Sequence, residues 1–203
     1  VIARHLVDPS DGRPCEEAGL GTGGSVYARA MSSMVIEPVS PVFGADVLNI
    51  DLSAPFDDST FAAIHQAFLA YGVLFFRNQA AIPEATQLAF ARRFGPLHTH
   101  PAAPTDDPDA AIFVIHAHRD SPVANGNGWH SDVSCDVEPP MATMLQIHTL
   151  PDGGGADTLF ANMEAAYQGL PDELRDRLRG LTALHESEHV YRGRYADRGV
   201  DDR

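Results

Sequence analysis

The sequence predicts a mixed α+β fold. Two segments repeat apolar residues at helical spacing, and a third begins at a proline and stops at a glycine, as helices do. Several short apolar or alternating runs between glycines and prolines have the period of strands. The chain has 203 residues, of which 44% are hydrophobic and 21% are charged. A chain of this length and composition can bury a core of its own, so we expect one globular domain, or at most two.

The first third of the chain changes character near residue 34. Residues 1–33 have no sustained helical or strand period and are rich in Gly and acidic residues, so we expect a flexible or non-native extension. Residues 34–203 are expected to form the domain. It begins with two strands, residues 35–39 and 45–50, which are separated by turn-forming Pro and Gly residues.

Residues 57–71 predict a helix that ends at Gly72. Asp58 or Ser59 can cap its start, because both side chains can accept a hydrogen bond from a free backbone N–H of the first turn. The apolar positions that repeat at helical spacing, and that we expect to face the core, are Phe61, Ile64, Phe68 and Tyr71.

The remaining elements follow the same signals. Further strands are predicted at residues 73–76, 111–115, 141–150 and 158–161, with a loop at 119–128 and a turn at the glycines 153–155. Further helices are predicted at residues 83–94 and 171–181. The second of these has a leucine stripe that we expect to be buried, made of Leu170, Leu174, Leu178 and Leu181.

Residues 129–137 alternate between apolar and polar side chains, which predicts a strand with two different faces. His130 and Asp132 would then leave the same face. An imidazole and a carboxylate that can reach one ion supply two ligands of a facial triad, the two-histidine, one-carboxylate site that holds non-haem Fe(II). We therefore take His130 and Asp132 as the candidate metal ligands.

A His-x-Asp triplet also arises by chance in a chain with ten histidines, and a second copy occurs at 118–120. That copy lies in the predicted loop, without the glycine-rich segment or lysine that would make it a phosphate-transfer site. The strand pattern and the two prolines at 139–140 favour the copy at His130. A different metal-binding β-sandwich that holds zinc or nickel remains open. Asp136 and Glu138 form a carboxylate pair, but no second acidic pair supports glycoside hydrolysis.

The net charge of the chain limits the kinds of molecule that we expect it to bind. The 14 basic residues, all of them Arg, stand against 28 acidic ones and give a net charge of -14. Such a chain repels phosphate backbones and anionic headgroups, so we expect a small-molecule substrate and neither nucleic acid nor membrane. The absence of a long apolar run and the two cysteines fit a cytoplasmic protein. A homo-oligomer is compatible with these features.

Four blocks of sequence recur in the same order and with similar spacing in a known family. They are GVLFFRNQ at 72–79, LAFARRFGPLHTHP at 88–101, GWHSDVSCDVEPPMATML at 128–145 and LPDGGGADTLFANMEAAYQGLP at 150–171. On these blocks the sequence resembles the taurine dioxygenase-like family of Fe(II)/2-oxoglutarate-dependent dioxygenases. The ordered set is far more specific than any one triplet.

The resemblance implies a double-stranded β-helix, or jelly roll, with flanking helices. Residues 34–203 would be its N-terminal part, so we expect the jelly roll to be incomplete. It also implies an enzyme that uses Fe(II), with 2-oxoglutarate and molecular oxygen as cosubstrates. The enzyme would hydroxylate a small substrate, such as a sulfonate or another anion in taurine catabolism, and release succinate and carbon dioxide.

The resemblance also implies roles for individual residues. His130 and Asp132 match the first two iron ligands and are the catalytic residues. Thr158 matches a contact to the 2-oxoglutarate carboxylate. His100 matches a histidine that contacts the substrate anion, and Asn127 stands beside the position of an asparagine that holds the sulfonate in some members.

Family members take the third iron ligand from a His-Pro segment, and a later arginine pairs with 2-oxoglutarate. We expect both to lie beyond residue 203, because no His-Pro dipeptide follows residue 132. The histidines left as substitute ligands are His148, His185 and His189. The alternative function is therefore a catalytically inactive, truncated remnant or an interaction module of the same fold.

Overall fold

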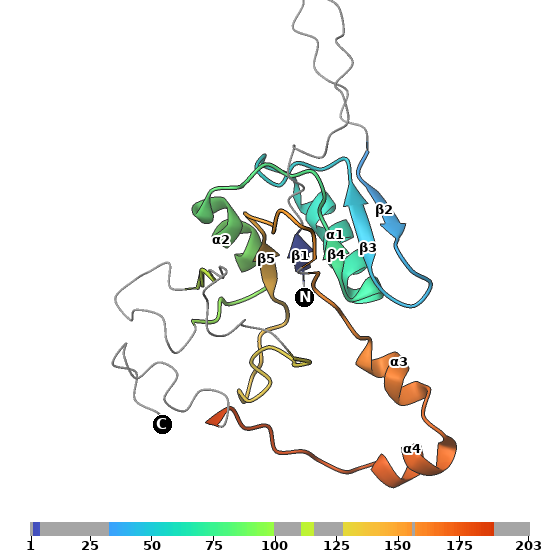
Figure 1. Cartoon of the computed structure of the whole chain (residues 1–203). Coiled ribbons are helices and arrows are strands. Elements are labelled where there is room, and N and C mark those ends of the chain that lie inside the picture. The colour runs from blue at the N-terminus through green and yellow to red at the C-terminus, as the bar shows by residue number, and fades with distance from the viewer. Residues whose placement is uncertain (1, 5–32, 100–110, 116–127, 156, 189–203) are drawn as a thin grey trace, which may run out of the picture. The chain divides into compact units, whose positions relative to one another are not determined.

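The fold is built around one sheet in a computed structural model, of which residues 2–4, 33–99, 111–115, 128–155 and 157–188 are described here (Figure 1). The strands are β1 (Ile2–Arg4), β2 (Val35–Pro38), β3 (Ala45–Leu48), β4 (Leu74–Phe75) and β5 (Met144–Gln146). The helices are α1 (Asp58–Tyr71), α2 (Glu84–Arg92), α3 (Met163–Gln168) and α4 (Asp172–Leu178). The predicted mixture of helices and strands is confirmed.

The chain divides into two units. The first consists of Val1–Ile82 with Met144–Ala166 and contains the sheet and α1. The second consists of Pro83–Thr143 with Tyr167–Arg203 and contains α2, α4 and the candidate ligand pair.

The sheet has the strand order β2-β3-β4-β1-β5. Strands β2 and β3 are antiparallel and pair Val35 with Leu48, whereas β3 with β4, β4 with β1 and β1 with β5 are parallel. The parallel pair β3 and β4 is joined through α1, because parallel neighbours need a crossover connection. Strand β1 lies within residues 1–33, which the sequence predicts as an extension, and this division of the chain stays a prediction.

The core of the first unit lies between the sheet and α1, which contacts β3 and β4. Strand β3 buries Ala45 and Val47 at alternate positions, and α1 buries Ile64, Ala67 and Phe68. Burying each large apolar side chain contributes about 1.5–3 kcal/mol. The largest fully buried side chains, which all come from predicted strand or helix segments, are Phe76, Ile64, Leu74, Val47 and Val73.

Helix α1 has defined caps at both ends. Asp57 is the N-cap, and its carboxylate accepts a hydrogen bond of 2.7 Å from the Thr60 backbone N–H. This corrects the predicted caps Asp58 and Ser59. Gly72 ends the helix as predicted, with φ +71° and its N–H donating to Phe68 O at 2.8 Å. That backbone region favours glycine.

Two glutamines satisfy backbone groups outside the strand ladders of the first unit. The Gln79 side chain accepts from Leu52 N at 2.9 Å and donates to Ile50 O at 2.7 Å. The Gln146 side chain, from β5, accepts from Ile82 N at 3.1 Å. These bonds fix loops that would otherwise leave partly buried polar groups without partners.

Most of the other predicted elements occur, with shorter bounds. Strands β2, β3, β4 and β5 and helices α1, α2 and α4 fall inside the segments predicted for them. The glycines 153–155 form part of a turn, in which Gly154 N donates to Pro151 O at 3.1 Å. Helix α3 was not predicted, and the predicted loop 119–128 lies almost wholly outside the described residues.

Three strand predictions are wrong, namely residues 111–115, 129–137 and 158–161. In the second of these the chain turns, because Asp136 N donates to Val133 O at 3.1 Å and Val133 has φ +53°. Its apolar side chains face solvent, with Trp129 at 72% exposure and Val137 at 100%. The alternation of apolar and polar residues is therefore not enough to predict a strand. A strand also needs a neighbouring strand with which its backbone can form hydrogen bonds.

The leucine stripe of the last helix is also not buried as predicted. Leu174 and Leu178 of α4 are 38% and 40% exposed, and Leu181 beyond it is 68% exposed. No helix in the described part of the chain is long and apolar enough to cross a membrane.

Candidate metal centre

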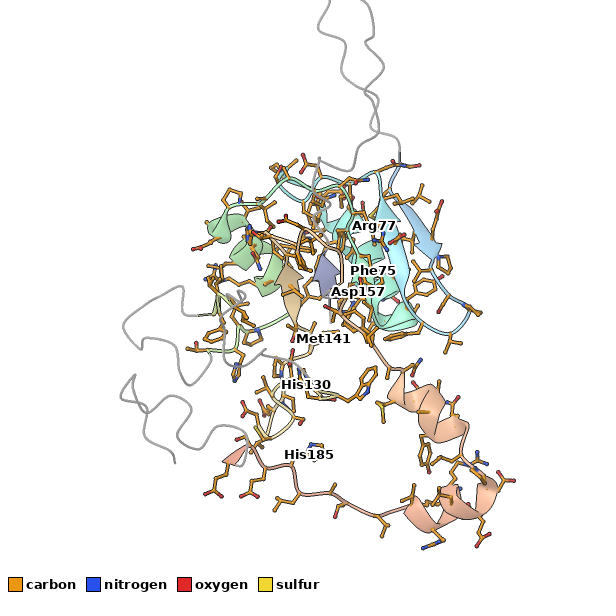
Figure 2. All side chains as sticks on the ribbon, in the orientation of Figure 1. Phe75, Arg77, His130, Met141, Asp157 and His185 are labelled. Atoms are coloured by element: carbon orange, nitrogen blue, oxygen red, sulfur yellow. The ribbon has the colours of Figure 1, made fainter. Side chains whose placement is uncertain are left out.

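The two candidate ligands lie together on the turn of the second unit. His130 Nε2 is 3.2 Å from Asp132 Oδ1, and the two side chains are 57% and 41% exposed. The predicted strand is absent here, but the predicted meeting of imidazole and carboxylate is present. A tight turn brings residues two apart together as effectively as a shared strand face does. Figure 2 shows His130 on the segment that leads to Met141.

The hydrogen bond at the other ring nitrogen defines the tautomer of His130. Nδ1 lies 2.8 Å from Gly128 O. A carbonyl oxygen only accepts, so Nδ1 carries the proton and, in the neutral ring, Nε2 presents a lone pair. Metal-binding histidines have this arrangement, in which one nitrogen donates to a carbonyl and the other binds the ion.

Neutral His130 would therefore set a lone pair against the Asp132 carboxylate at 3.2 Å. Two acceptors at this distance repel each other unless a positive charge sits beside both of them. A proton on Nε2 or a metal ion supplies that charge. Nitrogen and oxygen donors of this kind suit Fe(II), so the pair fits two of the three positions of the facial triad.

The second oxygen of Asp132 has its own partner. The Thr143 hydroxyl donates to Oδ2 at 2.6 Å. Thr143 directly precedes β5 and is half-buried. Sequence reasoning missed this residue, because a threonine eleven positions away carries no pattern that would connect it to the carboxylate.

Two more side chains hold the same turn. Ser134 Oγ lies 3.0 Å from His185 Nδ1, and Asp136 Oδ2 lies 3.1 Å from His98 Nε2. Together with Asp132, these residues occupy alternate positions, and each reaches a partner from another segment of the second unit. Hydrogen bonds at Asp132, Ser134 and Asp136 therefore hold the turn at three points along its length and restrain the candidate ligand pair.

Two of the histidines considered as substitute ligands have other hydrogen-bond partners. His185 faces Ser134, and His148 of the first unit lies with its Nε2 3.0 Å from the Gln146 amide nitrogen. His189 lies outside the described residues. In the part of the chain that the structure describes, no group of three or more His, Cys, Asp or Glu could hold a metal ion.

The other predicted site residues are Thr158, His100 and Asn127. Thr158 belongs to the first unit and is exposed. His100 and Asn127 lie outside the described residues, so their predicted substrate contacts stay predictions.

Comparison with known proteins identifies the family. Residues 36–203 match the family described as taurine catabolism dioxygenase TauD, TfdA family. The chain belongs to this TauD/TfdA family. This match confirms the resemblance seen in the four sequence blocks. It also confirms that the relatives of the chain are dioxygenases.

Two curated relatives of this TauD/TfdA chain are named for sulfate esters or their cleavage. It is 37% identical over 150 residues to an alkylsulfatase of Acinetobacter baylyi, a match that covers 74% of this chain and 46% of the relative. It is 33% identical over 156 residues to an alpha-ketoglutarate-dependent sulfate ester dioxygenase of Pseudomonas putida, covering 77% and 50%. The chain spans about half the length of these relatives.

A solved structure supplies the fold of the TauD/TfdA chain. A taurine dioxygenase from Burkholderia xenovorans matches with a TM-score of 0.58 and 29% identity, over 73% of this chain and 52% of that one. The chain therefore has the taurine dioxygenase fold, and the predicted jelly-roll class is confirmed at that level. The expected incompleteness of the jelly roll stays a prediction.

Proposed function

We propose that this chain contributes the metal-binding part of an Fe(II)/2-oxoglutarate-dependent dioxygenase that hydroxylates a small anionic substrate. The proposed substrate class is a sulfonate or another small anion, and succinate and carbon dioxide are the coproducts. The observation that carries the proposal is the 3.2 Å approach of His130 Nε2 to Asp132 Oδ1, with Nδ1 committed to Gly128 O. Membership of the TauD/TfdA family supports the reaction class.

Each residue has a defined part in this proposal. His130 and Asp132 hold Fe(II) through one nitrogen and one oxygen, which leaves positions for a third protein ligand, the cosubstrate and oxygen. The bound metal supplies the oxygen activation that no protein side chain can perform. The Thr158 hydroxyl donates to a 2-oxoglutarate carboxylate, and His100 and Asn127 contact the substrate anion.

The net charge of -14 suggests a second role for the metal, which is to attract the negatively charged cosubstrate. 2-Oxoglutarate is a dianion, and a strongly acidic chain repels it. A divalent ion held by His130 and Asp132 would provide local positive charge, so we infer that the cosubstrate would bind only after the metal. The same charge supports a small-molecule substrate rather than nucleic acid or an anionic membrane surface.

One observation favours the alternative of a non-catalytic module. Two protein donors hold Fe(II) weakly, and no third donor joins the pair among residues 33–99, 111–115, 128–155 and 157–188. A remnant of the fold would keep the geometry of His130 and Asp132 without turnover. Metal binding and succinate release are therefore measured separately.

The test is an anaerobic titration of the 203-residue chain with Fe(II) and 2-oxoglutarate. We expect the visible metal-to-ligand absorption band of the ternary complex, and its loss in His130→Ala and in Asp132→Ala. His118→Ala is the matched control, because it removes the histidine of the other His-x-Asp triplet. Equal bands in the wild type and both ligand variants would reject the site. A band without succinate release in air would identify the non-catalytic module.

A further inference from the structure

The two oxygens of the Asp132 carboxylate are used differently. Oδ1 faces His130 Nε2 at 3.2 Å, and Oδ2 accepts the Thr143 hydroxyl at 2.6 Å. The second distance is in the range of a hydrogen bond from a hydroxyl to a charged carboxylate, which is stronger than one between neutral groups. The carboxylate therefore has one oxygen directed at His130 and the other at Thr143.

The bond to Thr143 connects separate parts of the chain. The two residues are eleven positions apart, and the turn that includes Val133 and Asp136 lies between them. Thr143 is half-buried, whereas the hydrogen bond itself is exposed, so its short length is the observation that supports a firm contact. The contact thus fixes the rotation of a carboxylate that is itself 41% exposed.

We propose that Thr143 is a positioning residue of the metal centre, which holds Asp132 so that only Oδ1 reaches the ion. This inference rests on the proposed function of the His130 and Asp132 pair. A carboxylate that binds through both oxygens takes two coordination positions, whereas the facial triad needs one from each ligand and keeps the others open. Thr143 preserves an open position by occupying Oδ2.

The experiment measures metal binding in the absence of 2-oxoglutarate and oxygen. Co(II) is titrated into the full chain, and its visible absorption gives the dissociation constant and reports the coordination number. Thr143→Val keeps the branched shape and removes the donor, and Thr143→Ser keeps the donor. Loss of such supporting hydrogen bonds typically weakens metal affinity about 10- to 100-fold. We expect a weakening in that range for the valine variant and wild-type affinity for the serine variant.

A change in the absorption spectrum is expected as well. Without the hydroxyl, Oδ2 is free to bind, so Co(II) in the valine variant should show the weaker absorption of a higher coordination number. A merely structural role of Thr143 would leave the bound spectrum unchanged. Thr86→Val, in α2, is the matched control, because it makes the same substitution in the same unit and away from the ligand pair.

The outcomes separate the two proposals. Wild-type affinity and spectrum in Thr143→Val, with binding lost in His130→Ala and Asp132→Ala, would overturn the role of Thr143 and leave the metal site standing. Absence of Co(II) binding in the wild type would overturn both. If thermal unfolding shows that the valine variant does not fold, the comparison uses Thr143→Ala and Thr143→Ser, where only the alanine variant should weaken binding.

Discussion

His185 Nδ1 lies 3.0 Å from Ser134 Oγ, although the two residues are 51 positions apart in the chain. The contact brings a distant segment to the turn that carries His130 and Asp132. It also uses one nitrogen of His185 for the turn itself. His185 therefore supports the segment that carries the candidate ligands.

We accordingly expect His185→Ala to weaken Co(II) binding much less than His130→Ala, which removes binding. The reason is that no three-ligand group is found in the described part of the chain, so His185 acts only through its contact with Ser134 of the turn. Isothermal titration calorimetry measures both variants. A loss of affinity in His185→Ala as large as that in His130→Ala would instead identify His185 as a ligand.

Binding of 2-oxoglutarate should depend on the metal. With a net charge of -14 and no lysine, the chain offers the dianion little attraction of its own. We expect no measurable heat when 2-oxoglutarate is titrated into metal-free chain, and a clear binding signal once Mn(II) is present. Equal binding with and without metal would contradict the proposed order.

Thr158→Val should weaken cosubstrate binding without affecting the metal. A hydrogen bond to a charged group contributes about 1.5–3 kcal/mol, which corresponds to roughly 10- to 100-fold in affinity. Thr158 is exposed, so loss of its hydroxyl should not lower the stability of the first unit. The dissociation constants of 2-oxoglutarate and of Co(II) are compared in the same variant. A change in the second alone would place Thr158 elsewhere than at the cosubstrate.

Gly72→Ala should destabilise the first unit by about 1–3 kcal/mol, the typical cost of a side chain in the left-handed region. Gly72 has φ +71°, and an added Cβ would lie 2.7 Å from Phe43 Cε2. The free energy of unfolding from urea titration is the measurement. Gly153→Ala is the control, because an added Cβ there would have no neighbour within 4 Å. Equal stability of the two variants would contradict both the backbone strain at Gly72 and the clash with Phe43.

Asp57→Ala should cost about 1 kcal/mol through loss of the N-cap of α1. The carboxylate accepts from the Thr60 backbone N–H at 2.7 Å, so its removal leaves that donor unpaired. Asp57→Ser retains a capping oxygen and should stay close to the wild type in thermal unfolding. If the serine variant is as unstable as the alanine variant, the aspartate acts through its charge on the helix dipole rather than as a cap.

Residue spacing and turn residues predict the elements that short stretches of sequence define by themselves. Helix α1 followed from its apolar repeat and Gly72, and β3 and β4 from short apolar runs. Strand β1 could not be predicted, because its three residues are defined by pairing with β4 and β5 far along the chain. Likewise, the leucines of α4 repeat at helical spacing, as predicted, but they are exposed and do not form part of a core.

The candidate site was predicted for a reason that proved partly wrong. Strand parity suggested that His130 and Asp132 face each other, and they do so on a turn with Val133 at φ +53°. The supporting contacts, such as the Thr143 hydroxyl, depend on tertiary geometry and leave no trace in residue spacing. Residue types thus indicated the candidate pair, and only the three-dimensional structure shows which contacts hold it in place.

Strand β1 lies between β4 and β5, so its two neighbours are synthesised at very different times. On the ribosome, Leu74 becomes available to Ile2 long before Met144 does. Until then one ladder of β1 has no partner, and such edges are sites of misassembly in nascent chains. A chaperone that shields this edge during translation would therefore raise the yield of folded protein more than one that acts after release.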